Sequence, residues 1–165
     1  MNVLVLSDTH MPSHAKQFPP PLLAALEQAN LILHAGDMTT AWVLEELRRY
    51  ALVVGVAGNN DDDQLCVELP RTAIVPVGRF RVGLVHGDGD GGSTFSRAAA
   101  AFPSGTVDCV VFGHSHQPLI ERRGNVLYLN PGSPTDRRRE PRFSFAWLNA
   151  VETLEAEHVF FESKT

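Results

Sequence analysis

The sequence predicts an α/β domain, and three observations lead to this prediction. Short apolar runs rich in β-branched residues alternate with segments whose apolar residues recur at helical spacing. The 165 residues fit one domain, and their composition, 44% hydrophobic and 20% charged, is ordinary for a globular protein. The chain also contains no internal repeat, low-complexity segment or linker-like stretch. We therefore expect one domain over residues 1–165 that begins with βαβ units and ends with antiparallel strands.

The first third of the chain contains the βαβ units. Prolines in residues 18–21 precede a helical pattern, and proline is well tolerated in the first turn of a helix. Thr39 or Thr40 is placed to cap the next helix, because a threonine hydroxyl can accept a hydrogen bond from a free amide there. The expected elements are a strand at 2–6, a helix at 22–30, a strand at 31–33, a helix at 41–50 and a strand at 52–56.

The remainder of the chain mixes hairpins with one more helix. Gly78 and Arg79 separate two apolar runs, which is typical of a hairpin turn. Ser93 is expected to cap an alanine-rich helix that ends before Pro103. The expected elements are hairpin strands at 72–77 and 80–85, a helix at 94–102, an apolar strand at 107–112, and hairpin-like pieces at 119–130 and 143–161.

Charge, hydropathy and cysteine content narrow the function classes. A net charge of −5 lacks the basic surface expected of a nucleic-acid-binding protein. No apolar run approaches the roughly 20 residues needed to cross a membrane, and the N-terminus lacks the basic leader of a signal peptide. Cys66 and Cys109 lie far apart in apolar runs, so we expect two reduced, buried thiols and a cytoplasmic protein.

Polar side chains follow five of the predicted strands. The segments at these strand ends are SDTH (7–10), HAGD (34–37), GNND (58–61), HGD (86–88) and GHSH (113–116). Ligands of α/β sheets bind beyond the carboxyl ends of the strands, so we expect the five segments to meet at one place. They supply seven nitrogen and oxygen donors: Asp8, His10, Asp37, Asn59, His86, His114 and His116.

Seven donors exceed the needs of a single four-coordinate ion and suit two divalent ions. Imidazole and carboxylate ligands without thiolate favour Mn²⁺, Fe, Zn²⁺ or Ni²⁺, and of these we expect Mn²⁺. Two such ions about 3.5–4 Å apart can hold a hydroxide and stabilise an in-line displacement at phosphorus. With only two carboxylates among the donors, the ions keep a positive surplus that attracts a phosphate ester.

The five segments, in this order and spacing, resemble those of the calcineurin-like metallophosphoesterases, in particular the small bacterial and archaeal phosphodiesterases related to the retromer subunit Vps29. The resemblance runs from Asp8 to about Ser133, where the chain reads NPGS (130–133), a sequence also familiar from that group. It implies one metallophosphoesterase domain built as a four-layer α/β/β/α sandwich, with two mixed β-sheets between helices. It also implies a dinuclear phosphodiesterase in which a metal-bound hydroxide attacks the phosphorus of a phosphate diester.

The resemblance also distributes the donors over the two ions. It implies that Asp37 bridges them, and that His86, His116 and Asn59 contribute to catalysis by stabilising the charged transition state. By this assignment one ion is held by Asp8, His10, Asp37 and His116, and the other by Asp37, Asn59, His86 and His114.

Asn60 departs from the pattern of many family members, which have a histidine there that can protonate the leaving group. Loss of general acid catalysis usually costs about 10²–10⁴ in rate. The small phosphodiesterase branch often lacks this histidine too, so the change does not imply an inactive enzyme. We therefore expect weak hydrolysis of alkyl monoesters and faster hydrolysis of activated or diester substrates.

Several residues near these segments have alternative roles. Asn60, Asp61 and Arg137 are candidate substrate-binding residues. Asp61 opens a run of three aspartates that can equally form a helix start, and Arg137 lies in the run DRRR (136–139), which can equally be an exposed turn. His34 is expected to be a hydrogen-bonded structural residue beside the site.

Two other functions stay open on the sequence alone. The fold can serve as a non-catalytic scaffold, as the Vps29 resemblance allows, although no metal ligand has been lost here. The same metal site can also serve a phosphomonoesterase or a pyrophosphatase. The expected partner is a phosphate ester substrate, and the apolar C-terminal strands either cover a sheet edge or pair with a second copy in a homo-oligomer.

Overall fold

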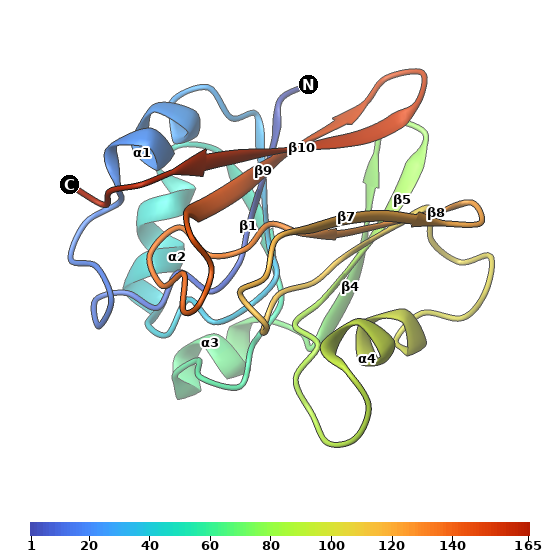
Figure 1. Ribbon diagram of the computed structural model, residues 1–165, viewed down its shortest axis with the longest axis horizontal. Helices are drawn as coiled ribbons and strands as arrows, with labels where there is room; N and C mark the ends of the chain where they lie inside the picture. The colour runs from blue at the N-terminus through green and yellow to red at the C-terminus, as the bar shows by residue number, and fades with distance from the viewer.

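Two five-stranded β-sheets lie face to face between helices in the computed structural model, which describes residues 1–165 (Figure 1). The strand order is β10-β9-β1-β2-β3 in the first sheet and β4-β5-β6-β8-β7 in the second. Helices α1 and α2 pack on the outer face of the first sheet, and α4 packs on the outer face of the second. The predicted four-layer α/β/β/α sandwich is confirmed.

The first sheet joins the two ends of the chain. Strands β1, β2 and β3 are parallel, whereas β9 runs antiparallel to β1 and β10 antiparallel to β9. The predicted hairpin over residues 143–161 is thus confirmed. The strands are β1 (Val3–Leu6), β2 (Leu31–His34), β3 (Leu52–Gly55), β9 (Phe143–Ala150) and β10 (Leu154–Phe161).

The second sheet has a parallel centre and antiparallel edges. Strands β5, β6 and β8 are parallel, and β4 and β7 form hairpins at the two edges. Gly78 makes the predicted turn between β4 and β5 with φ +60°, a conformation that suits glycine. The strands are β4 (Thr72–Val77), β5 (Phe80–Val85), β6 (Cys109–Val111), β7 (Leu119–Arg123) and β8 (Val126–Asn130).

The four helices are short: α1 (Pro20–Leu26), α2 (Ala41–Arg48), α3 (Asp63–Glu68) and α4 (Thr94–Ala100). Helix α1 starts within the prolines and ends four residues before the predicted end. Ser93 caps α4 as predicted, by accepting a hydrogen bond from the Ser96 amide. None of these helices has the length and apolar character that a membrane span requires.

The cap of α2 differs from the prediction. Thr40 is the cap residue, but its hydroxyl donates to the Met11 carbonyl oxygen at 3.1 Å and does not bind the helix. Asp62 takes its place, because its Oδ2 accepts a hydrogen bond from the Ala41 amide at 3.0 Å. The start of α2 is therefore tied to the GNND segment that follows β3.

Alternation along the strands divides the core into an inner and an outer layer. Val3 and Val5 point into the space between the sheets, whereas Leu4 and Leu6 point toward the helices. Cys109 is buried between the sheets as predicted. The prediction for Cys66 was wrong: it is exposed, because Leu65 is the only buried residue of α3.

Candidate metal centre

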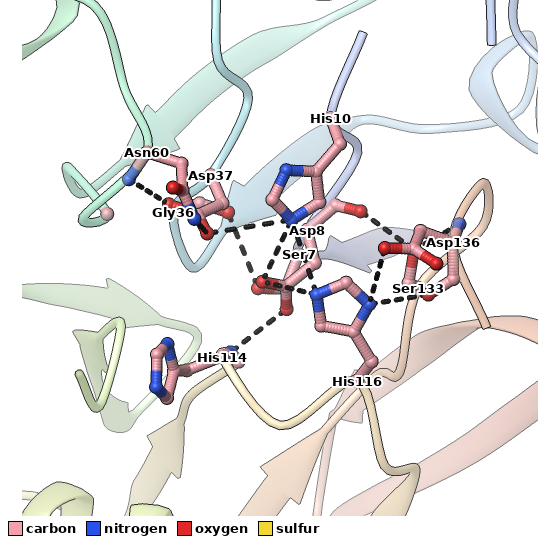
Figure 2. A network of polar contacts seen from close by, with 12 residues as sticks. Ser7, Asp8, His10, Gly36, Asp37, Asn60, His114, His116, Ser133 and Asp136 are labelled. Atoms are coloured by element: carbon pink, nitrogen blue, oxygen red, sulfur yellow. Dashed lines mark hydrogen bonds and ion pairs between the residues drawn. The ribbon is translucent and has the colours of Figure 1, made fainter. Parts of the chain in front are cut away.

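The five polar segments meet at one edge of the sandwich, beyond the carboxyl ends of β1, β2, β3, β5 and β6. Figure 2 shows Asp8 and Asp37 near the middle of the resulting network, with His10 and His116 close to them. Two groups of buried donors have ligand atoms that all lie within 4.8 Å of one another: Asp8, His10 and His116, and Asp8, Asp37 and His86.

In the first group, two imidazoles face one carboxylate. The Nε2 atoms of His10 and His116 are 3.2 Å apart, and the Nε2 atom of His116 lies 3.4 Å from Asp8 Oδ1. The Nε2 atom of His10 lies 3.8 Å from the same oxygen. Convergence of nitrogen and oxygen donors at this range is what a divalent ion needs.

In the second group, His86 faces both carboxylates. Its Nε2 atom lies 3.2 Å from Asp37 Oδ2 and 3.9 Å from Asp8 Oδ1. Asp37 Oδ2 also lies 3.5 Å from His10 Nε2, which belongs to the first group. These distances suit Asp37 as a bridge between two ions and give Asp8 a similar shared position.

Two atoms at the centre have no hydrogen-bond partner although they are buried: Asp8 Oδ1 and His86 Nε2. A buried polar atom without a partner is costly, and native structures rarely keep one without a reason. Both atoms point into the donor set and would be satisfied by coordination to a cation. The donors present here therefore fit the divalent ions that the sequence predicts.

Contacts behind the ligands fix the orientation of the histidine rings. His86 donates from Nδ1 to the Ala35 carbonyl oxygen at 2.7 Å, so its Nε2 faces the carboxylates. His116 donates in the same way from Nδ1 to the Asp136 carbonyl oxygen, and Asp136 Oδ2 lies 3.6 Å from that nitrogen. Such backing groups favour the tautomer that leaves Nε2 free for a metal.

His34 has the structural role that the sequence predicts. Its Nδ1 accepts from the Gly36 amide at 3.2 Å, which leaves Nε2–H to donate to the Thr9 hydroxyl at 3.2 Å. Burial lowers the pKa of His34 to about 3, so the ring is neutral and suited to both contacts. His34 thereby links the SDTH segment to the HAGD segment.

Close packing of opposite charges controls ionisation in the centre. Burial raises the pKa of Asp8, yet the neighbouring His10, His116 and His86 side chains outweigh it and hold this pKa well below its usual range. Burial likewise raises the pKa of Asp37, but His86 and Asn60 lower it to about 2.

The opposite shift is found at His86. Burial lowers the pKa of His86, but Asp37, Asp8 and the Ala35 carbonyl raise it to about 9. The carboxylates are therefore anionic at neutral pH and attract cations.

Asn59 and His114, the remaining two predicted ligands, lie at the open side of the centre. His114 Nδ1 is 3.2 Å from Asn59 Oδ1, and the His114 ring lies edge-on to the His86 ring with centroids 5.2 Å apart. Asn59 is exposed and His114 is partly exposed. The structure thus groups five predicted ligands tightly and places these two together beside them.

Asn60 and Asp61, predicted as substrate-binding residues, contact the Asp37 segment instead. Asn60 Nδ2 donates to Asp37 Oδ2 at 2.8 Å. The Asp61 carboxylate accepts from the amides of Gly58, Asp37 and Thr39 at 2.7–3.1 Å. Both residues therefore hold a predicted ligand in place, a role that the sequence suggested for Asp61 but not for Asn60.

Arg137 does not point where its predicted role requires. Its guanidinium donates to the Pro141 carbonyl oxygen and lies over the Phe143 ring. Arg138, the next residue, is the arginine that contacts the site, since its Nη1 donates to the His114 carbonyl oxygen at 3.1 Å. A substrate-binding role is therefore better placed on Arg138 than on Arg137.

Backbone geometry at the centre depends on glycines and on unusual ligand conformations. A Cβ atom at Gly58 would lie 2.1 Å from Asp37 Oδ1, and one at Gly113 would lie 1.8 Å from Ser7 Oγ. No side chain fits at either position. Seven residues other than glycine have positive φ, and five of them are predicted ligands: Asp8, His10, Asp37, His114 and His116. Clusters of such strained residues are typical of functional sites.

The segment from Ser133 of NPGS to Asp136 makes hydrogen bonds that hold the SDTH segment and His116 in place, and the sequence did not indicate them. Ser133 Oγ donates to the Asp8 carbonyl oxygen at 2.7 Å, and Thr135 Oγ1 donates to the Thr9 carbonyl oxygen at 2.6 Å. Asp136 accepts from His116 as described above. The NPGS sequence, familiar from the family, was the one feature of this segment that pointed to a role at the site.

Sequence comparison shows the family. The chain matches the calcineurin-like phosphoesterase superfamily domain over residues 1–153. A probable metallophosphoesterase of Methanothermobacter thermautotrophicus is 40% identical over 159 residues, which cover 95% of this chain and 91% of the relative. The chain therefore belongs to the calcineurin-like phosphoesterase superfamily, as its five segments indicate.

Two solved structures share the fold. Wild-type Vps29 of Entamoeba histolytica, complexed with zinc, has a TM-score of 0.74 and 26% identity, covering 97% of this chain and 99% of that one. An archaeal phosphodiesterase has a TM-score of 0.74 and 22% identity, covering 98% of this chain and 100% of that one. The fold is thus found in proteins described both as Vps29 and as a phosphodiesterase.

Proposed function

We propose that this protein hydrolyses phosphate diesters with two divalent metal ions, preferably Mn²⁺, held around Asp8 and Asp37. The observation that carries the proposal is the position of these two carboxylates. Each lies at most 3.9 Å from imidazole nitrogens of both donor groups. Carboxylates shared between two sets of imidazoles suit a pair of neighbouring ions better than a single ion.

The protein's own residues position the reaction. Two ions bound here would supply a hydroxide nucleophile at neutral pH and stabilise charge on the phosphate oxygens. Asn59 and His114 occupy the exposed side, so the substrate enters there and its scissile phosphate lies against them. Asn59 is the side chain proposed to contact the phosphate oxygens as negative charge develops. The buried His86 and His116 are proposed to contribute through the ions that their Nε2 atoms would hold.

Asn60 supports a diester substrate over an alkyl monoester. Its side-chain amide donates to Asp37 at 2.8 Å and has no acidic proton to give to a leaving group. Leaving groups that need no proton from a side chain are therefore favoured, and an alkyl leaving group has to take its proton from water.

Hydrolysis of bis(p-nitrophenyl) phosphate and of p-nitrophenyl phosphate by chelator-stripped protein tests the proposal. Added Mn²⁺ should restore turnover, with a higher kcat/KM for the diester than for the monoester. Turnover that favours the monoester would support a phosphomonoesterase instead. Absence of turnover with Mn²⁺, Fe²⁺, Zn²⁺ and Ni²⁺ would contradict a hydrolytic function.

A non-catalytic scaffold is the second candidate, and the likeness to Vps29 of Entamoeba histolytica favours it. Metal-dependent turnover separates the two functions, because the Vps29 structure is itself a zinc complex. A catalyst should copurify with or take up close to two ions per chain, and its turnover should follow their number. A scaffold would show no gain in activity on metal addition.

We place the protein in the cytoplasm. Cys66 and Cys109 are both free thiols, one exposed and one buried between the sheets. Unpaired cysteines are usual in a reducing compartment. Labelling of the exposed thiol in freshly lysed cells would test this location, since an oxidising compartment would leave it modified.

A further inference from the structure

The loop that carries His114 and His116 separates two pockets of different chemistry. Ser115, between these two predicted ligands, and Gln117 line both pockets, so both pockets lie against this loop. One pocket, of about 370 Å³, has no charged residue in its lining and includes Phe95 and Phe112. The other, of about 130 Å³, is lined by three arginines and one carboxylate.

The second pocket concentrates positive charge in a chain whose net charge is −5. Its lining residues are Ser115, Gln117, Arg137, Arg138, Arg139 and Glu140. The three arginines outnumber the single carboxylate, and all three are exposed. The Arg137 guanidinium binds the Pro141 carbonyl oxygen, so Arg138 and Arg139 are the two arginines proposed to bind a ligand here. Arginine is the side chain best suited to bind a phosphate, because its planar guanidinium offers two parallel N–H donors. We call this site the arginine pocket.

Arg138 is held in place by the same segment that supports the metal centre. Its Nη1 donates to the His114 carbonyl oxygen at 3.1 Å, which leaves its other guanidinium N–H groups for a ligand. Its backbone amide donates to Asp136 Oδ1 at 3.3 Å, and the Asp136 carbonyl oxygen accepts from His116. Arg138 also has φ +51°, a conformation that residues with side chains rarely adopt. The position of Arg138 is therefore coupled to that of two predicted ligands.

We propose that the arginine pocket binds a second phosphate of the substrate, so that the protein prefers small phosphodiesters with a terminal phosphate on one arm. The inference rests on the proposed function and adds the class of substrate. A pocket of about 130 Å³ is smaller than the roughly 300–1,000 Å³ that encloses a whole ligand, so it suits one group of a larger substrate. The uncharged pocket on the other side of Ser115 suits the neutral arm.

The chemistry at the scissile phosphorus is ordinary hydrolysis. Oxygen from water bonds to this phosphorus, and the bond from phosphorus to one ester oxygen breaks. The released oxygen leaves as an alcohol with a proton from the same water, and the terminal phosphate stays intact. The arginine pocket takes no part in bond breaking and acts through substrate binding.

The experiment compares two substrates that differ by one phosphate: the thymidine dinucleotide TpT and its 5′-phosphorylated form pTpT. For each, kcat/KM is measured with the Mn²⁺-loaded full chain by chromatography of the products. Wild type should prefer pTpT, and Arg138→Gln should lower the pTpT:TpT ratio roughly ten- to hundred-fold, as expected for a lost charged hydrogen bond. Arg139→Gln should lower the ratio in the same direction. Arg142→Gln is the matched control, since Arg142 lies over the Phe160 ring outside the pocket and should leave the ratio unchanged.

The outcomes separate this inference from the proposed function. If wild type hydrolyses TpT but gains nothing from the added phosphate, or if neither pocket variant changes the ratio, the arginine pocket is not a phosphate subsite and the diesterase function stands. If neither diester is hydrolysed, calorimetric binding to the same Mn²⁺-loaded protein decides. Selective loss of pTpT binding in Arg138→Gln would then support the subsite while the proposed function fails, and equal binding of both dinucleotides would overturn both.

Discussion

The donor set of the metal centre has a buried half and an exposed half. Asp8, His10, Asp37, His86 and His116 are buried, whereas Asn59 is exposed and His114 is partly exposed. Carbonyl oxygens and amides behind the buried half fix the orientation of its members, while the side chains of Asn59 and His114 contact each other at 3.2 Å. The difference indicates that the buried half determines whether ions bind and the exposed half determines how substrate meets them.

Asp37→Ala should have the largest effect, because it removes a carboxylate that lies within 3.5 Å of an imidazole nitrogen from each donor group. We expect kcat/KM for bis(p-nitrophenyl) phosphate to fall by about 10³-fold or more, beyond the roughly 10–100-fold typical of groups behind a metal ligand. Bound metal, measured by elemental analysis, should fall in parallel. A thermal melt checks that the variant folds, and a folded variant with more than a tenth of wild-type activity would contradict the assignment.

Asn59→Ala should have a smaller effect, because water can replace an exposed ligand. We expect a loss of about 10–100-fold in kcat/KM. Metal should still bind to the five buried donors. Asn125→Ala, which removes an exposed amide on a pocket away from the metal centre, is the control and should keep full activity. A loss as large as that of Asp37→Ala would remove the distinction between the two halves.

Metal affinity should rise with pH. The Nε2 atom of His86 binds a metal only after losing its proton, and Asp37 and Asp8 raise the pKa of His86 to about 9 in the metal-free protein. From pH 6.5 to 9 an incoming ion therefore displaces a proton, so the affinity for Mn²⁺ should increase by about tenfold per pH unit and level off above pH 9. Titration calorimetry in buffers of different ionisation enthalpy measures both the affinity and the proton release. An affinity that stays constant over this range would show that His86 is not a ligand.

Asp62→Ala should have the smallest effect and should act on stability. Asp62 caps α3 through Leu65, with N···Oδ1 2.9 Å, and binds the first amide of α2 at 3.0 Å. Loss of a helix cap costs about 1–2 kcal/mol in the free energy of unfolding, which urea denaturation can measure. Asp63→Ala is the control, since Asp63 has the same charge in the same turn without a capping contact. Equal losses in the two variants would show that charge alone matters here.

The convergence of the five segments was predictable because the carboxyl ends of parallel strands lie at one edge of a sheet. That argument covers β1, β2 and β3, whose registers are parallel. It does not place His86 or His114, which follow strands of the second sheet. All five segments were expected to meet, but the strand-end rule alone does not show how two sheets stack, so it does not explain why these two join the others.

Other features were not predictable because they depend on single backbone angles or distant contacts. Arg138, which contacts the His114 carbonyl oxygen, has a positive φ that no sequence pattern reveals. Ser133 reaches Asp8 across 125 positions of sequence. Cys66 lies on a helix of six residues, which is too short for periodicity to reveal its buried face.

The left-handed backbone at five of the predicted ligands lowers the free energy of unfolding of the metal-free chain. Each such residue costs on the order of 1–3 kcal/mol, and glycine at the same position would relieve the strain while removing the ligand. In the metal-free chain, the substitutions that stabilise the fold most at these positions are therefore those that inactivate it. A laboratory selection for heat resistance without metal would enrich inactive variants, whereas the same selection with metal present would retain the ligands.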